Sequence, residues 1–180
     1  MSGWSSGYVI GKHAVAGDLS QFYNSLKLKE EFYNLQRFLY RQNLGVDEEV
    51  LEGIIVTLMY GVKSVSAQSE EAMLQLAKDF EKQFPALAKL IREGRYVDDM
   101  GDSKALKAEI VQLIKDAEKV FAKVGIICKA WTENGGKPEE KVAGENAYIG
   151  IGGLHWYPET DQVSVPIPPL HFGTVKRGRL

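Results

Sequence analysis

The run Tyr96-Val97-Asp98-Asp99-Met100 places two neighbouring carboxylates after a short segment that favours β-structure. Arg95-Tyr96-Val97 predicts an incoming strand, and Gly101 allows the chain to leave a turn, so we expect a β-hairpin with both acids at its tip. Like charges this close repel each other, and a cation shared with phosphate oxygens, most often magnesium, relieves the repulsion. A solvated turn rich in Asp and Gly is the simpler alternative. The run alone leaves both interpretations open.

The composition predicts one globular domain with a substantial core, because 44% of the 180 residues are hydrophobic and 26% are charged. A net charge of -2 and a pI near 6.0 argue against binding of nucleic acid by bulk charge, so any such binding must be local. A lone cysteine, Cys128, excludes an internal disulfide and argues against a cysteine-rich zinc site. We expect it to be a buried structural thiol.

The N-terminal region, residues 1–13, is rich in Gly and Ser and has no basic region followed by a long apolar run. No later segment approaches the length that spans a membrane. We therefore expect an intracellular protein, in the cytoplasm or nucleus, without a membrane partner.

Two segments have the apolar spacing of amphipathic helices. The first follows Ser66 and ends at Phe84-Pro85. The second is expected over residues 103–124, with Ser103 as N-cap and Gly125 as the terminating residue. Its apolar stripe comprises Leu106, Ile110, Leu113, Ala117, Val120, Phe121 and Val124.

Strand and turn signals surround these helices and predict an α+β fold. We expect an antiparallel sheet, like that of a polymerase palm, with the two helices on one face. Residues 54–60 are predicted to be a buried strand that forms a long hairpin with residues 36–40, and residues 148–156 and 162–167 are predicted to form another hairpin. Further strands are expected over 13–19 and from residue 126 to a turn at 134–136.

Asp18 is a third acid, at the end of the strand predicted over residues 13–19. If that strand neighbours the hairpin of Asp98 and Asp99, three carboxylates gather at one edge of the sheet and can hold two magnesium ions. This is the arrangement used for nucleotidyl transfer. One ion lowers the pKa of a primer 3'-hydroxyl, and the other neutralises the departing pyrophosphate.

Several blocks, in order, resemble the palm of a reverse transcriptase, closest to the Pao/BEL type of long-terminal-repeat retrotransposon. The resemblance covers roughly residues 14–170, and the order and spacing of its blocks make it more specific than any one of them. The blocks are Asp18-Leu19-Ser20-Gln21-Phe22-Tyr23, Gln36-Arg37-Phe38-Leu39-Tyr40-Arg41, Met59-Tyr60-Gly61-Val62-Lys63-Ser64, Tyr96-Val97-Asp98-Asp99, Lys129-Ala130-Trp131-Thr132-Glu133-Asn134, and Gly153-Leu154-His155-Trp156 with Asp161.

The resemblance implies that Asp18, Asp98 and Asp99 bind magnesium or manganese, with the Leu19 carbonyl as a further ligand. Tyr23 would lie under the sugar of the incoming nucleotide, or else be a core aromatic. The remaining implied site residues are Gly61 and Lys63 for the nucleotide, Tyr96, Gly153, Leu154, His155 and Trp156 for the primer, and Lys129 or Lys123 as proton donor to pyrophosphate. Packing or a solvated surface position is the alternative for Lys63, Tyr96, Trp156 and both of these lysines.

The same resemblance divides the chain into a fingers remnant or disordered segment over 1–13, a palm over 14–147, a hairpin resembling the primer grip over 148–170 and a basic tail over 171–180. Its partners would be a primer–template of RNA or DNA and a dNTP. Complete relatives add longer basic fingers, a thumb and often a ribonuclease H domain, which a longer polyprotein would supply. One departure from the pattern is Val65, where relatives commonly carry Pro.

The leading interpretation is therefore the palm fragment of an RNA-directed DNA polymerase. A catalytically inactive, retroelement-derived scaffold or interaction protein is the second, favoured by the missing subdomains and the acidic balance. A nucleotidyl cyclase, which also uses paired acids and two metals, is the third. Dependence on a template separates the three.

Overall fold

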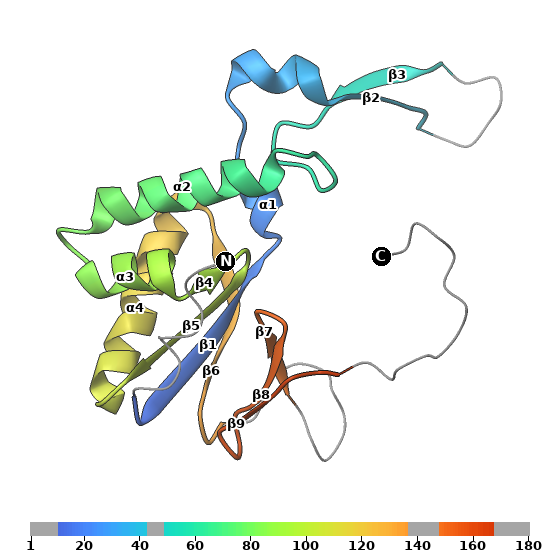
Figure 1. The fold of residues 1–180 in the computed structure, drawn as a ribbon. Helices are drawn as coiled ribbons and strands as arrows, with labels where there is room; N and C mark the ends of the chain where they lie inside the picture. The colour runs from blue at the N-terminus through green and yellow to red at the C-terminus, as the bar shows by residue number, and fades with distance from the viewer. Residues whose placement is uncertain (1–10, 43–48, 137–147, 168–180) are drawn as a thin grey trace.

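The computed structural model describes residues 11–42, 49–136 and 148–167, which form an α+β fold (Figure 1). Its centre is a four-stranded antiparallel sheet in the order β4-β5-β1-β6. The strands are β4 (Arg95–Tyr96), β5 (Asp99–Lys104), β1 (His13–Ser20) and β6 (Ile127–Glu133). The predicted α+β class and antiparallel sheet are thus present. The basic tail predicted over 171–180 and most of the predicted segment 1–13 lie outside the described residues.

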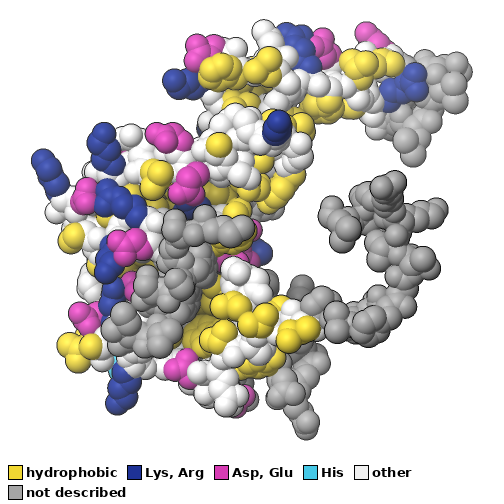
Figure 2. Space-filling model, viewed as in Figure 1, with side chains coloured by type: hydrophobic (Ala, Val, Ile, Leu, Met, Phe, Trp, Pro, Cys, Tyr) yellow, Lys and Arg dark blue, Asp and Glu magenta, His cyan; other side chains and the backbone are white. Residues whose placement is uncertain are grey.

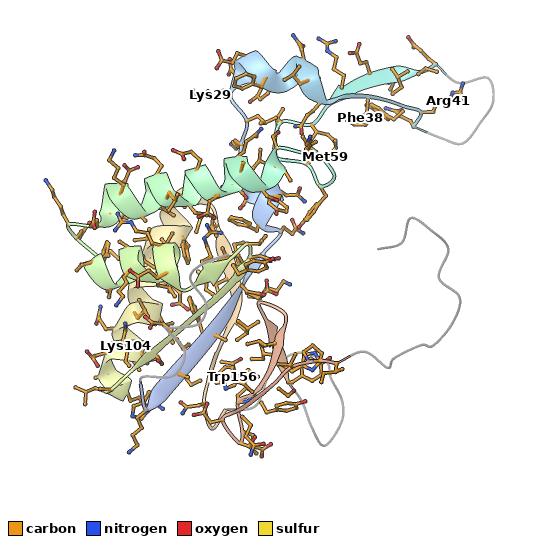
Figure 3. All side chains as sticks on the ribbon, viewed as in Figure 1. Lys29, Phe38, Arg41, Met59, Lys104 and Trp156 are labelled. Carbon is orange, nitrogen blue, oxygen red and sulfur yellow. The ribbon has the colours of Figure 1, made fainter. Side chains whose placement is uncertain are left out.

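The side chains of β1 contact a different layer on each face of the sheet, because successive side chains of a strand point to opposite faces. Leu19 belongs to the main core, which β1 shares with the helices. Ala14 and Ala16 instead pack with Trp156 of the C-terminal strands, and Figure 3 labels Trp156 in that layer. Asp18 follows the alternation of Ala14 and Ala16, so its side chain emerges on the face opposite the helices.

Three helices cover one face of the main sheet (Figure 1): α2 (Val65–Phe80), α3 (Pro85–Glu93) and α4 (Lys107–Val124). The sequence predicted two, the first ending at Phe84-Pro85. That helix ends at Phe80, and Pro85 begins α3 instead. Proline suits the first turn of a helix, where its missing amide donor is not needed.

The start of the last helix was predicted wrongly. Ser103 belongs to β5 and α4 begins at Lys107, because residues 99–104 pair with β1 and this pairing outweighs the capping signal. Leu106 precedes the helix, and its amide donates to Glu109 Oε2 over 3.1 Å. Its side chain is 63% exposed, and that of Val124, at the other end of the predicted stripe, is 41% exposed. The remaining predicted core positions of α4 are buried: Ile110, Leu113, Ala117, Val120 and Phe121. Among the described residues no helix combines the length and hydropathy needed to cross a membrane.

The predicted hairpin between residues 36–40 and 54–60 forms an arm outside the sheet. Its strands are β2 (Arg37–Tyr40) and β3 (Leu51–Ile54), and two short helices, α1 (Phe22–Ser25) and η1 (Glu30–Gln36), connect it to β1 (Figure 1). The expectation of a buried strand over 54–60 is wrong, since Ile54 and Val56 are 40% and 41% exposed. Strand β3 ends at Ile54 in the projecting arm, and of the residues that follow it Leu58 is buried in the main core.

The C-terminal strands form a separate three-stranded antiparallel sheet rather than the predicted two-stranded hairpin. It consists of β7 (Ile149–Ile151), β8 (Leu154–Tyr157) and β9 (Gln162–Ser164). The segment predicted as one strand over 148–156 turns back at Gly152 and Gly153, both with positive φ. Glycine adopts this conformation without steric cost, which explains the extra turn.

The buried stripe of α4 generates a test of the core. Leu113 is 1% exposed, so Leu113→Ala should lower the free energy of unfolding by about 2 to 5 kcal/mol. Val111→Ala is the matched control on the same helix, because Val111 is 36% exposed and should change stability by about 0.5 kcal/mol or less. Urea unfolding followed by circular dichroism measures both. Equal losses for the two variants would contradict the packing of α4.

Candidate functional site

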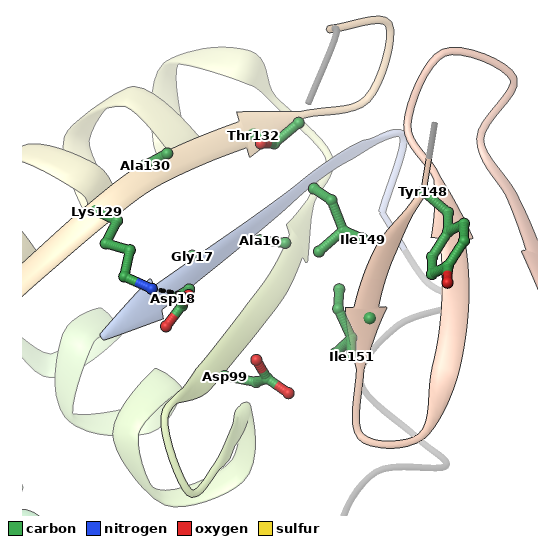
Figure 4. A pocket seen from close by; sticks show the side chains of 11 residues that line it. Ala16, Gly17, Asp18, Asp99, Lys129, Ala130, Thr132, Tyr148, Ile149 and Ile151 are labelled. Atoms are coloured by element: carbon green, nitrogen blue, oxygen red, sulfur yellow. Dashed lines mark hydrogen bonds and ion pairs between the residues drawn. The ribbon is translucent and has the colours of Figure 1, made fainter. Parts of the chain in front are cut away.

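The pairing of β1 with β5 brings two of the predicted acids together. Asp18 lies directly opposite Asp99 in the antiparallel register, and directly opposed side chains lie on the same face of a sheet. Both acids line a cavity of about 220 Å³. The other lining residues come from β1, β6 and the segment at β7, among them Lys129, Thr132 and Ile151 (Figure 4).

Asp98 occupies the turn between β4 and β5. Its carbonyl accepts a hydrogen bond of 2.8 Å from the Leu19 amide, which attaches the turn to β1. Val97, before it, has a φ of 57°, a left-handed conformation that a β-branched residue rarely adopts. Such strain persists where the surrounding structure enforces it, and it is concentrated at functional sites. The predicted hairpin is present, with Asp98 in its turn and Asp99 as the first residue of β5.

The carboxylates interact electrostatically. Burial raises the pKa of Asp99 from its ordinary value of 3.8 to about 6, and repulsion from Asp98 and Asp18 adds to the rise, although a 3.4 Å hydrogen bond from the Gly152 amide opposes it. Lys129 Nζ lies 3.0 Å from Asp18 Oδ2 and balances part of the charge (Figure 4). A cavity that confines like charges offers the hard oxygen ligands that a divalent cation prefers.

The residues present therefore suit magnesium or manganese in donor type and charge. Asp18 and Asp99 share the cavity, and repulsion from Asp98 reaches Asp99. Within the described residues, however, no group of three or more His, Cys, Asp or Glu side chains is assembled closely enough to hold a metal ion. The Leu19 carbonyl stays a predicted ligand. The Leu19 side chain is buried in the main core.

The predicted nucleotide residues lie at the base of the arm. Tyr23 is buried in the main core beside Phe22, so in this structure it is a core aromatic, which was the alternative to a nucleotide-binding role. It also contacts Tyr60 edge-on, with ring centroids 4.8 Å apart, which brings the first block to the turn at Gly61. Gly61 has a φ of 87°, and Lys63 is exposed.

The predicted primer block lies on the small C-terminal sheet. Trp156 is buried and donates from Nε1 to Asp161 Oδ1 over 3.0 Å, as its packing alternative requires. His155 stacks on Tyr148 with ring centroids 3.7 Å apart. Gly153 lies in the same turn as Gly152, whose amide donates a hydrogen bond to Asp99 Oδ2 over 3.4 Å. Leu154 follows this turn and is partly exposed. The remaining predicted primer residue, Tyr96, lies on the main sheet instead, where it pairs with Asp99 across the β4–β5 hairpin.

The sequence reasoning missed Gly152 and Thr132 as residues of this site. The Gly152-Gly153 pair is a turn signal that could have indicated a hairpin within residues 148–156. Thr132 carries no such signal, because only the pairing of β6 with β1 directs it to the cavity. Cys128 is half-buried rather than fully buried, and burial raises the pKa of its thiol to about 11, as expected of an unreactive structural thiol.

Comparison with family models and with curated proteins finds no match to this sequence. The resemblance to reverse transcriptases therefore stays a prediction that rests on the sequence blocks.

The raised pKa of Asp99 predicts an unusual pH dependence of stability. Between about pH 4 and pH 6 the folded chain binds more protons at Asp99 than the unfolded chain, so this group lowers the free energy of unfolding as pH rises. Asp99→Asn should reduce that slope and stabilise the protein at pH 7.

The measurement is urea unfolding at several pH values, with Asp79→Asn on the exposed end of α2 as control. The control should keep the wild-type slope. An unchanged slope in Asp99→Asn would show that Asp99 titrates normally in the folded protein.

Proposed function

We propose that this chain is the palm portion of an RNA-directed DNA polymerase of the reverse transcriptase type. It would transfer a nucleotidyl group from a dNTP to the 3'-hydroxyl of a primer. The observation that carries the proposal is the pairing of β1 with β5, which sets Asp18 opposite Asp99 in one cavity. The Tyr96-Val97-Asp98-Asp99 block lies on that hairpin, as the resemblance requires.

In this proposal Asp18, Asp98 and Asp99 hold magnesium or manganese. The bound ions would lower the pKa of the primer hydroxyl and stabilise charge on the phosphates. The chain itself supplies position and charge. Asp99 must lose its proton to bind a cation, and Lys129 offers a positive charge beside Asp18 that can contact a phosphate.

Two projecting parts of the molecule supply surfaces for a primer–template. The β2–β3 arm and the β7–β8–β9 sheet extend on the same side of the main sheet (Figure 1). Hydrophobic side chains gather on both, as Figure 2 shows. On the arm, Phe38 and Tyr40 form an exposed aromatic pair with ring centroids 5.6 Å apart. Exposed aromatic rings can stack on nucleic-acid bases, which supports a contact with the template or primer.

A catalytically inactive scaffold derived from such a palm is the second candidate. The Lys129–Asp18 ion pair favours it, because Lys129 already neutralises one of the acids that a metal would need. The exposed apolar residues of the arm favour it too, since contiguous apolar surface commonly marks an interaction site.

Primer extension tests the polymerase proposal. The chain is assayed alone and joined to the fingers and thumb of a polymerase of this family, with dNTPs, a primed RNA template and magnesium or manganese. We expect very low incorporation alone and template-dependent incorporation in the completed protein. Asp18→Asn, Asp98→Asn and Asp99→Asn should each lower its rate by about 10²-fold or more, because reacting groups lose their alignment.

Asp102→Asn is the matched control, since Asp102 is also on β5 but pairs with Lys104 and does not line the cavity. It should leave incorporation unchanged. Titration of the isolated wild-type chain with Mn²⁺ adds a readout independent of turnover. The variants Asp18→Asn, Asp98→Asn and Asp99→Asn should bind Mn²⁺ more weakly than Asp102→Asn. A folded, completed protein without template-dependent incorporation would favour the scaffold. Template-independent conversion of a nucleoside triphosphate would favour a cyclase.

A further inference from the structure

Arg95 is a buried arginine next to the turn that carries the acids. It is the first residue of β4, and its side chain is 1% exposed. The guanidinium lies near the Phe22 ring, with Cζ 5.9 Å from the ring centroid. A buried charge is unfavourable unless it is paired and hydrogen-bonded, so the partners of Arg95 indicate what it holds in place.

These partners belong to two different elements. Nη1 donates to the Val97 carbonyl over 2.8 Å, and Nη2 forms an ion pair with Glu70 of α2. Nε is buried and has no hydrogen-bond partner within the described residues. The guanidinium thus connects α2 to the turn between β4 and β5. Lysine, with a single nitrogen, does not offer the same fork of donors.

The contact with Val97 falls at the strained position of the turn. Val97 has a φ of 57°, and its side chain packs against the main core. The Val97 carbonyl belongs to the peptide unit that leads into Asp98, and the next carbonyl, of Asp98, accepts from the Leu19 amide. Fixing both carbonyls fixes the orientation of the chain from which Asp98 and Asp99 project.

We propose that Arg95, held by Glu70, is a positioning residue that maintains the left-handed conformation of Val97 and thereby directs Asp98 and Asp99. The role given to the two acids rests on the proposed function, whereas the clamp on the turn does not. Because α2 begins four residues after Gly61, the clamp also joins the Gly61 block to the acid turn through one helix.

A double-mutant cycle on the full chain tests the clamp. Arg95→Met removes both hydrogen bonds while keeping a long apolar side chain, and Val97→Gly permits the left-handed conformation without steric strain. The first readout is hydrogen exchange of the Leu19 amide, which donates to Asp98. After correction for the change in global stability, Arg95→Met should speed exchange of the Leu19 amide at least tenfold when Val97 is present. When Val97→Gly is already present, the same substitution should speed this exchange less than threefold.

The second readout is Mn²⁺ affinity, which Arg95→Met should weaken about tenfold through the displaced acids. Arg92→Met is the matched control, because Arg92 forms an exposed pair with Glu81 through two hydrogen bonds of 2.6 and 3.0 Å. It should change neither readout. In the completed polymerase Arg95→Met should lower kcat with little change in the KM for dNTP, and Arg95→Lys should recover part of kcat.

If Arg95→Met fails to fold, Glu70→Gln serves instead, because the Glu70 side chain is half exposed and only its charge is removed. Equal effects of Arg95→Met, or of Glu70→Gln, in the presence and in the absence of Val97→Gly would overturn the clamp. A wild-type chain that binds no Mn²⁺ would count against the proposed function alone, since hydrogen exchange at Leu19 still decides whether Arg95 holds the turn.

Discussion

Strand β1 is hydrogen-bonded to β5 along one edge and to β6 along the other, and the candidate site depends on this double pairing. The pairing with β5 sets Asp18 against Asp99, and the pairing with β6 brings Lys129 to Asp18. Close approach requires glycine at position 17, where a Cβ atom would lie 2.7 Å from the Trp131 ring. A bulge between Gly17 and Leu19 adjusts the register with β6 at the same place.

Asp18, Asp98 and Asp99 with Lys129 form an unfavourable arrangement in which negative charge is only partly neutralised. Burial and repulsion both raise the pKa of Asp99, and the single cation at Asp18 does not remove that repulsion. Groups held in such a state are often functional, because a stable fold gains nothing from confining like charges. The strained backbone at Val97 is a second sign of a functional turn. The buried Arg95 donates a hydrogen bond to the carbonyl of this strained residue. Charge and backbone strain therefore point to the same few residues.

The β2–β3 arm shows a different physical problem. A lone two-stranded hairpin is marginally stable in water, so the arm depends on its base. There the Gln36 amide donates to the Ile55 and Thr57 carbonyls over 2.9 and 2.7 Å, and a mostly apolar cavity of about 520 Å³ separates η1 from the start of α2. Leu35 and Leu39 remain largely exposed. The arm thus offers apolar surface on the side of the molecule where the acids lie.

Sequence patterns determined the parts of this protein that rest on local chemistry: the α+β class, the β4–β5 hairpin and the buried face of α4. They failed where partners distant in the chain compete with local signals. Ser103 has the character of an N-cap but pairs with β1 as part of β5. Residues 54–60 have the character of a core strand, but the strand ends at Ile54 in the projecting arm, where Ile54 and Val56 are exposed. Only the tertiary structure decided that Asp99 faces Asp18 directly, while Asp98 occupies the turn, because that choice depends on strand register. The burial of Arg95 was likewise undetermined by sequence, since it requires α2 to pack over the turn.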